Sequence, residues 1–155
     1  MINMGKVEIL GFDLTANATL QTHSAPHTRL DLSLGYSYQY AVDRTDTTSK
    51  TYGHQIPYTP RHSGNATLTA STPWIGVGLS LMIVGERFAK QQNTPASRVP
   101  GYIDQGVTLS RSFDIGSTQL RAKIQVLNLF DVQYEVVKNY PMMGRNYRFG
   151  LTWII

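Results

Sequence analysis

The sequence contains no cysteine. A disulfide framework and metal sites built on thiolates are therefore excluded. Charged residues are also scarce, at 15% of the 155 residues, whereas a typical soluble domain carries about 25%. A hydrophobic fraction of 41% with a net charge of +4 does not fit intrinsic disorder, which needs low hydrophobicity and high charge. The composition indicates one folded domain with few charges for a solvated surface.

Long hydrophobic runs are missing as well. The longest apolar stretch, residues 73–85, is interrupted by glycine and serine and is shorter than the roughly 20 residues of a spanning helix. The first ten residues include Lys6 and Glu8 and no continuous apolar core, so we expect no secretory signal. The basic excess is spread along the chain, so we expect no nucleic-acid partner. Strands of a membrane β-barrel, which need only about 9–11 residues each, remain possible.

Apolar and polar residues alternate with a period of two along the chain. In residues 10–20, for example, the even positions read Leu, Phe, Leu, Ala, Ala and Leu, with polar or small residues between them. Helices place apolar residues three and four apart, so this pattern predicts strands. Clear strands are predicted at residues 10–20, 30–40, 75–83, 119–126 and 146–153, and weaker ones at 65–71 and 103–113. The sequence thus predicts about seven strands, most of them longer than the usual five to six residues.

The connections between these strands alternate in length. Residues 22–28, 71–74 and 114–117 are short, whereas 43–61, 88–101 and 131–145 are long and rich in Pro, Asn, Thr and Gly. Outer-membrane barrels sort short turns to the periplasmic side and long loops to the outside. Aromatic residues mark both ends of the predicted strands: Trp74, Phe113 and Trp153 at the short turns, and Tyr38, Tyr40, Phe88, Phe130 and Tyr147 at the long loops. This placement is typical of two interfacial girdles, although an aromatic core would explain it equally well.

The polar face indicates which way the sheet points. It consists mainly of Thr, Ser, Asn, Gln and Gly and lacks the Lys and Glu density of a solvated exterior. A water-filled lumen tolerates such residues, so we expect the apolar face to meet lipid. Seven strands are too few for a bacterial barrel, and an open edge in lipid would leave backbone groups unpaired. We therefore expect an all-β fold, an antiparallel up-and-down transmembrane β-barrel segment that is an open fragment of a larger barrel.

Four segments resemble the TonB-dependent outer-membrane receptors. Residues 3–6 (NMGK) followed by 11–14 (GFDL) are similar to the strand that begins the last third of their barrel. Residues 56–62 (IPYTPRH) resemble their P-x-x-P-x-H segment, and residues 126–131 (VLNLFD) with Tyr134 resemble their N-L-F-D-x-x-Y motif. Residues 140–147 (YPMMGRNY) resemble the Y-P-x-P-G-R lead into the final strand, with Met143 in place of the second proline. The resemblance is closest to Bacteroidota receptors of the cobalamin or siderophore type.

The resemblance implies a role in transport rather than catalysis. Residues 1–155 would be the C-terminal part of a barrel of about 22 strands, with no plug domain and no signal peptide in this sequence. The whole receptor would take up a scarce ligand such as a siderophore or cobalamin. Its partners would be outer-membrane lipid, the remaining barrel and plug, the TonB complex through the plug, and the barrel-assembly machinery through the C-terminal strand. That strand ends in Ile155 rather than the usual aromatic residue.

No catalytic or cofactor-binding constellation is present in the sequence. The four histidines, His23, His27, His54 and His62, show no metalloenzyme spacing. His23 and His27 could share a turn, but two ligands make a poor metal site, so we expect no catalytic, cofactor or metal residues. The polar-face charges that could pair across strands or contact a plug are Asp13, Asp31, Arg121, Lys123 and Arg148.

Ligand contacts would come most plausibly from the long loops, because Tyr and Arg are common at recognition sites. The candidates are Tyr52, His54, Tyr58, Arg87, Arg98, Tyr140 and Arg145. The same residue types also pack loops and anchor strands at the headgroup level, so the sequence identifies none of them as a binding residue. Two other interpretations stay open at this point: a small complete outer-membrane barrel with an adhesin or structural role, and a soluble lipocalin-like barrel that binds an apolar ligand inside.

Overall fold

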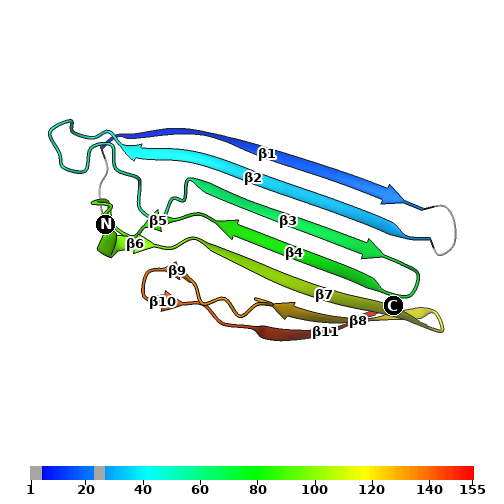
Figure 1. Cartoon of the computed structure of the whole chain (residues 1–155). Helices are drawn as coiled ribbons and strands as arrows, with labels where there is room; N and C mark the ends of the chain where they lie inside the picture. Colours follow the sequence, from blue (N-terminus) through cyan, green and yellow to red (C-terminus); the bar gives the residue numbers. More distant parts are fainter. Residues whose placement is uncertain (1–4, 23–26) are drawn as a thin grey trace.

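A seven-stranded antiparallel sheet forms the body of the protein (Figure 1). The computed structural model describes residues 5–22 and 27–155. The sheet order is β1-β2-β3-β4-β7-β8-β11. Its strands are β1 (Val7–Gln21), β2 (Arg29–Asp43), β3 (His62–Ser71), β4 (Gly76–Val84), β7 (Tyr102–Ile115), β8 (Thr118–Leu127) and β11 (Asn146–Ile154). All seven predicted strands are confirmed, each pairing with its neighbour in sequence.

The turn lengths alternate as the sequence predicts. β1 ends and β2 begins at the same end of the sheet as the short β3–β4 and β7–β8 connections, and the three long connections lie at the other end (Figure 1). β1 begins at the long-loop end and β11 ends at the short-turn end. The alternation of short and long connections therefore gives the sheet two chemically different ends.

Within the part of the chain that the structure describes, no helix is long and apolar enough to cross a membrane.

Two small sheets and a short helix lie in the long connections and were not predicted. β5 (Arg87–Phe88) pairs with β6 (Arg98–Val99), and β9 (Glu135–Val137) pairs with β10 (Tyr140–Pro141). The 3₁₀ helix η1 (Pro95–Ser97) lies between β5 and β6. Pairings of two or three residues are too short to show a period-two pattern. Their formation depends on contacts between loops.

The strands are longer than predicted at the long-loop end. β1 and β2 have 15 residues each, and Val7 pairs with Asp43 beyond the predicted limits of both strands. Crossing the apolar band takes about 9–11 residues, so the ends of β1 and β2 project past it. The alternation fades there because loop residues cover Ala41 and Val42, which are buried.

The strand register assembles continuous apolar rows across the sheet. One row crosses all seven strands through Ala18, Leu32, Leu68, Leu79, Val107, Val126 and Tyr147. The row one residue further along each strand, on the opposite face, is polar or small: Asn17, Ser33, Thr67, Ser80 and Gly106. A one-residue slip of any strand would exchange these two faces, so the rows specify the register.

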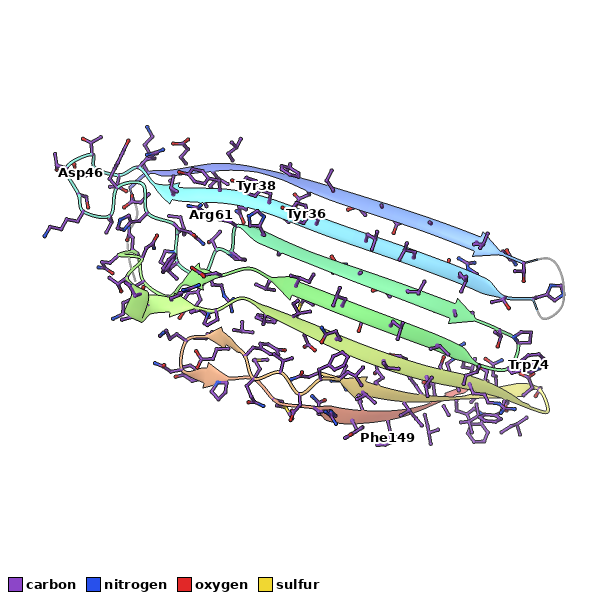
Figure 2. All side chains as sticks on the ribbon, in the orientation of Figure 1. Tyr36, Tyr38, Asp46, Arg61, Trp74 and Phe149 are labelled. Carbon is purple, nitrogen blue, oxygen red and sulfur yellow. The ribbon has the colours of Figure 1, made fainter. Side chains whose placement is uncertain are left out.

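The apolar face is not a sealed core. Leu79 is 48% exposed and Phe149 is 73% exposed, and Figure 2 shows Phe149 at the margin of the sheet on β11. The soluble lipocalin-like interpretation requires these side chains to be buried inside a closed barrel, and they are not. An uncovered apolar face of this size suits contact with acyl chains.

The sheet is open at both edges. β1 and β11 stand at the two ends of the strand order, so each has one neighbour in the sheet. Every residue of β1 is exposed. A small complete barrel would require β1 to pair with β11, and the order contains no such pair. The structure is therefore an arc of a larger barrel.

Aromatic residues lie at the short-turn end as predicted. Phe113 and Trp153 both pair with Leu120, which places them in one row on the apolar face. Trp74 lies in the β3–β4 turn (Figure 2), and the Arg111 guanidinium lies 5.0 Å from the centre of the Phe113 ring. A cation next to exposed rings at the end of an apolar band is the arrangement of side chains at a membrane interface.

The lipid-facing orientation predicts the effect of a charge on the apolar face. Leu79→Arg should destabilise the sheet in a bilayer by about 2–4 kcal/mol, the cost of Arg at the membrane midplane. Thr67→Arg, on the polar face of adjacent β3, is the matched control and should cost much less. Reversible urea unfolding of the barrel in phospholipid vesicles measures both. Equal stability of the two variants would contradict the orientation.

Candidate functional site: the long-loop layer

The three long connections form one layer at their end of the sheet. We call residues 44–61, 85–101 and 128–145 the long-loop layer. All non-glycine residues with positive φ among the described residues lie in it: Tyr58, Asn93, Asn128, Asp131 and Asn139. A positive φ is unfavourable for residues with a side chain and is least costly for Asn and Asp. The layer is therefore built from fixed tight turns.

The first loop continues the edge of β2. Asp43 donates its backbone N–H to the His54 carbonyl at 2.9 Å and accepts from the Gly53 N–H at 2.8 Å. The Ile56 N–H donates to the Ala41 carbonyl at 3.0 Å. These bonds satisfy backbone groups of β2 beyond the start of β3. The loop thus becomes an extension of the sheet.

The Asp43 carboxylate joins the first loop to the second. It is 2% exposed and accepts hydrogen bonds from the Thr45 N–H and the Thr51 hydroxyl, both at 2.9 Å, and from the Gln91 side-chain amide. The bonds from Thr45, followed by those from Thr51 and Gln91, hold the pKa of Asp43 at about 2, below its usual value, despite the opposing effect of burial. The hydrogen bonds from these loop residues therefore stabilise the ionised form of the Asp43 carboxylate.

Further hydrogen bonds fix the same pair of loops. The Gln55 N–H donates to the Asn93 side-chain carbonyl at 2.7 Å, and the Asn93 side-chain amide donates to the Gln55 carbonyl at 3.0 Å. The Tyr58 N–H donates to the Phe88 carbonyl at 2.8 Å. These three hydrogen bonds, together with the contact between Asp43 and Gln91, join loops one and two.

The Arg87 side chain joins the second loop to the third. It is 3% exposed, and its Nη2 donates to the carbonyls of Glu135 and Val136 at 2.8 and 2.9 Å. The guanidinium also lies 5.6 Å from the centre of the Tyr102 ring. Among the described residues its Nη1 has no hydrogen-bond partner. A buried cation stabilised by carbonyls and a ring ties β5 to β9.

A pair of stacked tyrosines lies beside this contact. The rings of Tyr102 and Tyr134 are 4.1 Å apart between centres and nearly parallel, and the Tyr134 hydroxyl donates to the Asp104 carboxylate at 2.8 Å. Burial, followed by the hydrogen bond to Asp104, raises the pKa of Tyr134. The phenol therefore stays protonated and acts as a permanent donor.

The residues of the N-L-F-D motif fold the third loop. Asn128 is buried and has a positive φ; its side chain accepts from the Val132 N–H at 2.8 Å and donates to the Met143 carbonyl at 3.3 Å. The Asp131 carboxylate accepts from the Arg145 N–H at 2.7 Å. A side chain at Gly144 would collide with that carboxylate. The spacing of the motif thus brings the end of β8 to the start of β11.

The loop residues that the sequence suggested as ligand contacts do not meet in one pocket. Tyr52, Tyr58, Arg98, Tyr140 and Arg145 are exposed at different places in the layer. His54 is half-buried, with its Nδ1 3.1 Å from the Gln91 carbonyl, and Arg87 is buried. None is identified as a ligand contact by its geometry.

Sequence reasoning missed the buried polar residues that organise the layer. The contact between Asp43 and Gln91 follows no local motif, because the two residues lie 48 positions apart in the sequence. Asn128 and Asp131 belong to the N-L-F-D motif, but the sequence analysis did not predict that their side chains would hold the third loop through hydrogen bonds to its backbone. Their unusual φ values are visible only in the folded chain.

The polar face carries the predicted charges in an open arrangement. Asp31 pairs with Arg29 at 2.7 Å and accepts from the Thr19 hydroxyl on β1 at 2.7 Å. Arg121 donates to the Ser112 hydroxyl at 3.4 Å. For Asp13, Lys123 and Arg148, contact with a plug stays a prediction.

Histidine and carboxylate positions give no metal centre in residues 5–22 and 27–155. No group of three or more His, Cys, Asp or Glu there could hold a metal ion. His27 is exposed, and His23 lies outside the described residues. The metal site of two histidines that the sequence analysis considered, His23 with His27, therefore lies partly outside the described residues.

Acidification should release the contact between loops one and two. Because the folded pKa of Asp43 is below that of a free carboxyl, near 3.9, its stabilising effect is complete above about pH 4 and is lost as the pH falls toward 2. The protection factors of the amides in residues 44–61, which are the intrinsic exchange rates at each pH divided by the observed ones, should fall over that interval. Asp43→Asn should show fast exchange already at neutral pH. An unchanged exchange rate in this variant would contradict the role of the carboxylate.

Loss of the Arg87 side chain should loosen the third loop. Arg87→Gln is expected to cost about 1.5–3 kcal/mol, the contribution of a charge-assisted hydrogen bond, and to speed proteolysis near residues 135–137. The control is Arg98→Gln: Arg98 is exposed and pairs with Glu86, and exposed pairs contribute about 0–1 kcal/mol. Equal proteolysis of both variants would contradict the anchoring role of Arg87.

The comparisons with known proteins agree with this architecture. A model of the family described as TonB dependent receptor-like, beta-barrel matches residues 1–129. Among curated proteins, none matches this sequence. The chain is similar to the crystal structure of the ferric citrate transporter FecA in the unliganded form, with 20% identity and a TM-score of 0.71, over 97% of this chain and 29% of that one. It is also similar to BauA, the ferric preacinetobactin receptor from Acinetobacter baumannii, with 14% identity and a TM-score of 0.67, over 95% of this chain and 27% of that one.

These matches fix the fold and the family. The chain spans less than a third of the length of either solved structure, in keeping with an open arc of a larger barrel. The family is one of outer-membrane receptors, not of enzymes. Together with the exposed apolar rows and the sorted loops, the family match over residues 1–129 shows that this chain belongs to the TonB-dependent receptor β-barrels of the outer membrane.

Proposed function

We propose that residues 1–155 are the C-terminal part of the barrel of a TonB-dependent active transporter for a scarce ligand such as a siderophore or cobalamin. The observation that carries the proposal is the open seven-stranded arc with an apolar outer face and a rigid layer of long loops at one end. Such an arc has a use only as part of a wall around a lumen. The similarity to a ferric citrate transporter and a ferric preacinetobactin receptor supports an iron complex as the ligand class.

The open edges specify the first group of partners. β1 and β11 each present unpaired backbone groups along one side, and each such group costs several kcal/mol in hydrocarbon. We infer that strands from the rest of the barrel pair with both edges. A plug domain would then face the polar rows, where Asp13, Arg121 and Lys123 are available for contact.

We infer a further partner, in assembly, from the C-terminal strand. In β11, Tyr147, Phe149, Leu151 and Trp153 occupy alternate positions on the apolar face and are all exposed. Alternate apolar and aromatic residues at the end of a barrel chain form the pattern that the barrel-assembly machinery reads in the family. Energy coupling would pass through the plug to the TonB complex, so this chain would supply the wall and the outer loops.

Uptake by the complete receptor tests the proposal. The reading frame that contains this chain should be expressed in a strain lacking its own receptors and supplied separately with ferric citrate, a ferric hydroxamate siderophore and cyanocobalamin. We expect accumulation of one of these ligands, abolished by deletion of the TonB complex. A stop codon at Asn146, which removes β11, should prevent assembly of the barrel in the outer membrane. A correctly assembled receptor that accumulates none of the ligands, with or without TonB, would contradict the proposal.

A further inference from the structure

A cluster of rings and one cation lies on the apolar face at the long-loop end. Tyr36, Tyr38 and Tyr40 are alternate residues of β2 on that face, in line with Leu14, Phe12 and Leu10 of β1. Arg61 directly precedes β3 and lies near Tyr36 and Tyr38 (Figure 2). His62 is the first residue of β3 and pairs with Tyr38. We call Tyr36, Tyr38, Tyr40, Arg61 and His62 the rim cluster. It lies where the lipid-facing surface meets the loop layer.

The rim cluster is held in place by contacts among its own members. The Tyr36 hydroxyl and His62 Nδ1 are 2.8 Å apart, and the rings of Tyr38 and His62 are 5.2 Å apart between centres. The Arg61 guanidinium carbon lies 5.2 Å from the centre of the Tyr40 ring. The cation–π contact with Tyr40 places the Arg61 guanidinium beside the cluster and leaves its N–H groups able to donate to a ligand.

Charge at the rim is positive and partly uncompensated. Arg61 is exposed, and the ion pairs among the described residues do not include it. Nearby Arg44 is paired with Glu8 at 2.6 Å, and Lys6 adds another positive charge at the start of β1. In the described chain the hydroxyls of Tyr38 and Tyr40 have no hydrogen-bond partner. Glu8 is already paired with Arg44, so the site offers Arg61 as a cation without an ion-pair partner among the described residues.

We propose that the rim cluster binds the phosphate of a phosphorylated lipid headgroup in the outer leaflet. Tyrosine belts lie at the headgroup level of a bilayer, so a phosphate at that depth meets the Arg61 fork, which matches phosphate geometry. Basic sites at the membrane surface recognise anionic headgroups in this way. The position on the apolar face, rather than the polar face, favours a lipid over free phosphate. The inference rests on the membrane orientation of the proposed barrel.

Lipid retention by the purified receptor tests the inference. The complete receptor in detergent is mixed with phosphatidic acid or with diacylglycerol of the same acyl chains, and native mass spectrometry counts the bound lipids. We expect retention of phosphatidic acid over diacylglycerol. Arg61→Gln should reduce that retention about fivefold, the effect of one cation lost at an anionic lipid surface, whereas Arg61→Lys should keep most of it.

The control removes the same charge from the opposite face. Arg148→Gln changes a polar-face residue of β11 and should leave phosphatidic acid retention unchanged. Equal retention by the parent and Arg61→Gln, or an equal loss in Arg148→Gln, would overturn the inference. Displacement of phosphatidic acid by an equal concentration of inorganic phosphate would assign the site to free phosphate and overturn the lipid as its ligand.

Folding is measured separately by the heat-dependent shift of barrel mobility in gels. A parent receptor without this shift contradicts the proposed barrel itself, whereas a folded receptor without headgroup selectivity contradicts only the rim cluster as a lipid site. If Arg61→Gln fails to fold, Tyr40→Leu, which removes the ring next to Arg61 and keeps the charge, provides the second measurement. Its expected result is reduced phosphatidic acid retention, and full retention would overturn the inference.

Discussion

Pairing of backbone hydrogen-bonding groups is the constraint on which this structure depends. In hydrocarbon, an unpaired N–H or C=O costs several kcal/mol, so strands survive there only within a closed sheet. The seven strands satisfy one another from β1 to β11 and leave one side of each outer strand without a partner. The open arc thus has the local chemistry of a barrel wall and requires further strands to complete it.

The same constraint explains why the two ends of the sheet differ. At the short-turn end, backbone groups leave the hydrocarbon within a few residues, and rings mark the boundary. At the other end, β1 and β2 extend past the band, and the loops take over the pairing of β2. Asp43 and Arg87 then connect the loops to one another through buried, charge-assisted hydrogen bonds. The three loops are thereby connected into one layer at this end of the sheet.

Some features of this fold can be predicted from neighbouring residues in the sequence, and others cannot. The placement of Leu32, Leu79 and Val107 on the apolar face was predictable, because side chains alternate between the two faces along each strand. The pairing of β5 with β6 was not, since two residues carry no period. Arg87 illustrates the limit: its sequence position suggested a ligand contact, whereas its environment is a buried anchor. Burial of a loop residue depends on which other loop covers it, and the residues next to it in the sequence do not show which loop that is.

By itself, the sequence determined the strand number, the direction of the apolar face and the alternation of short and long connections. Each of these follows from the side-chain period of a strand and the solvent that each face meets. The tertiary structure alone decided the register, the extension of β2 into the first loop, the joining of the three loops by Asp43 and Arg87, and the closure of the third loop by Asn128. These features depend on hydrogen bonds between residues far apart in the chain, whose partners no local pattern specifies.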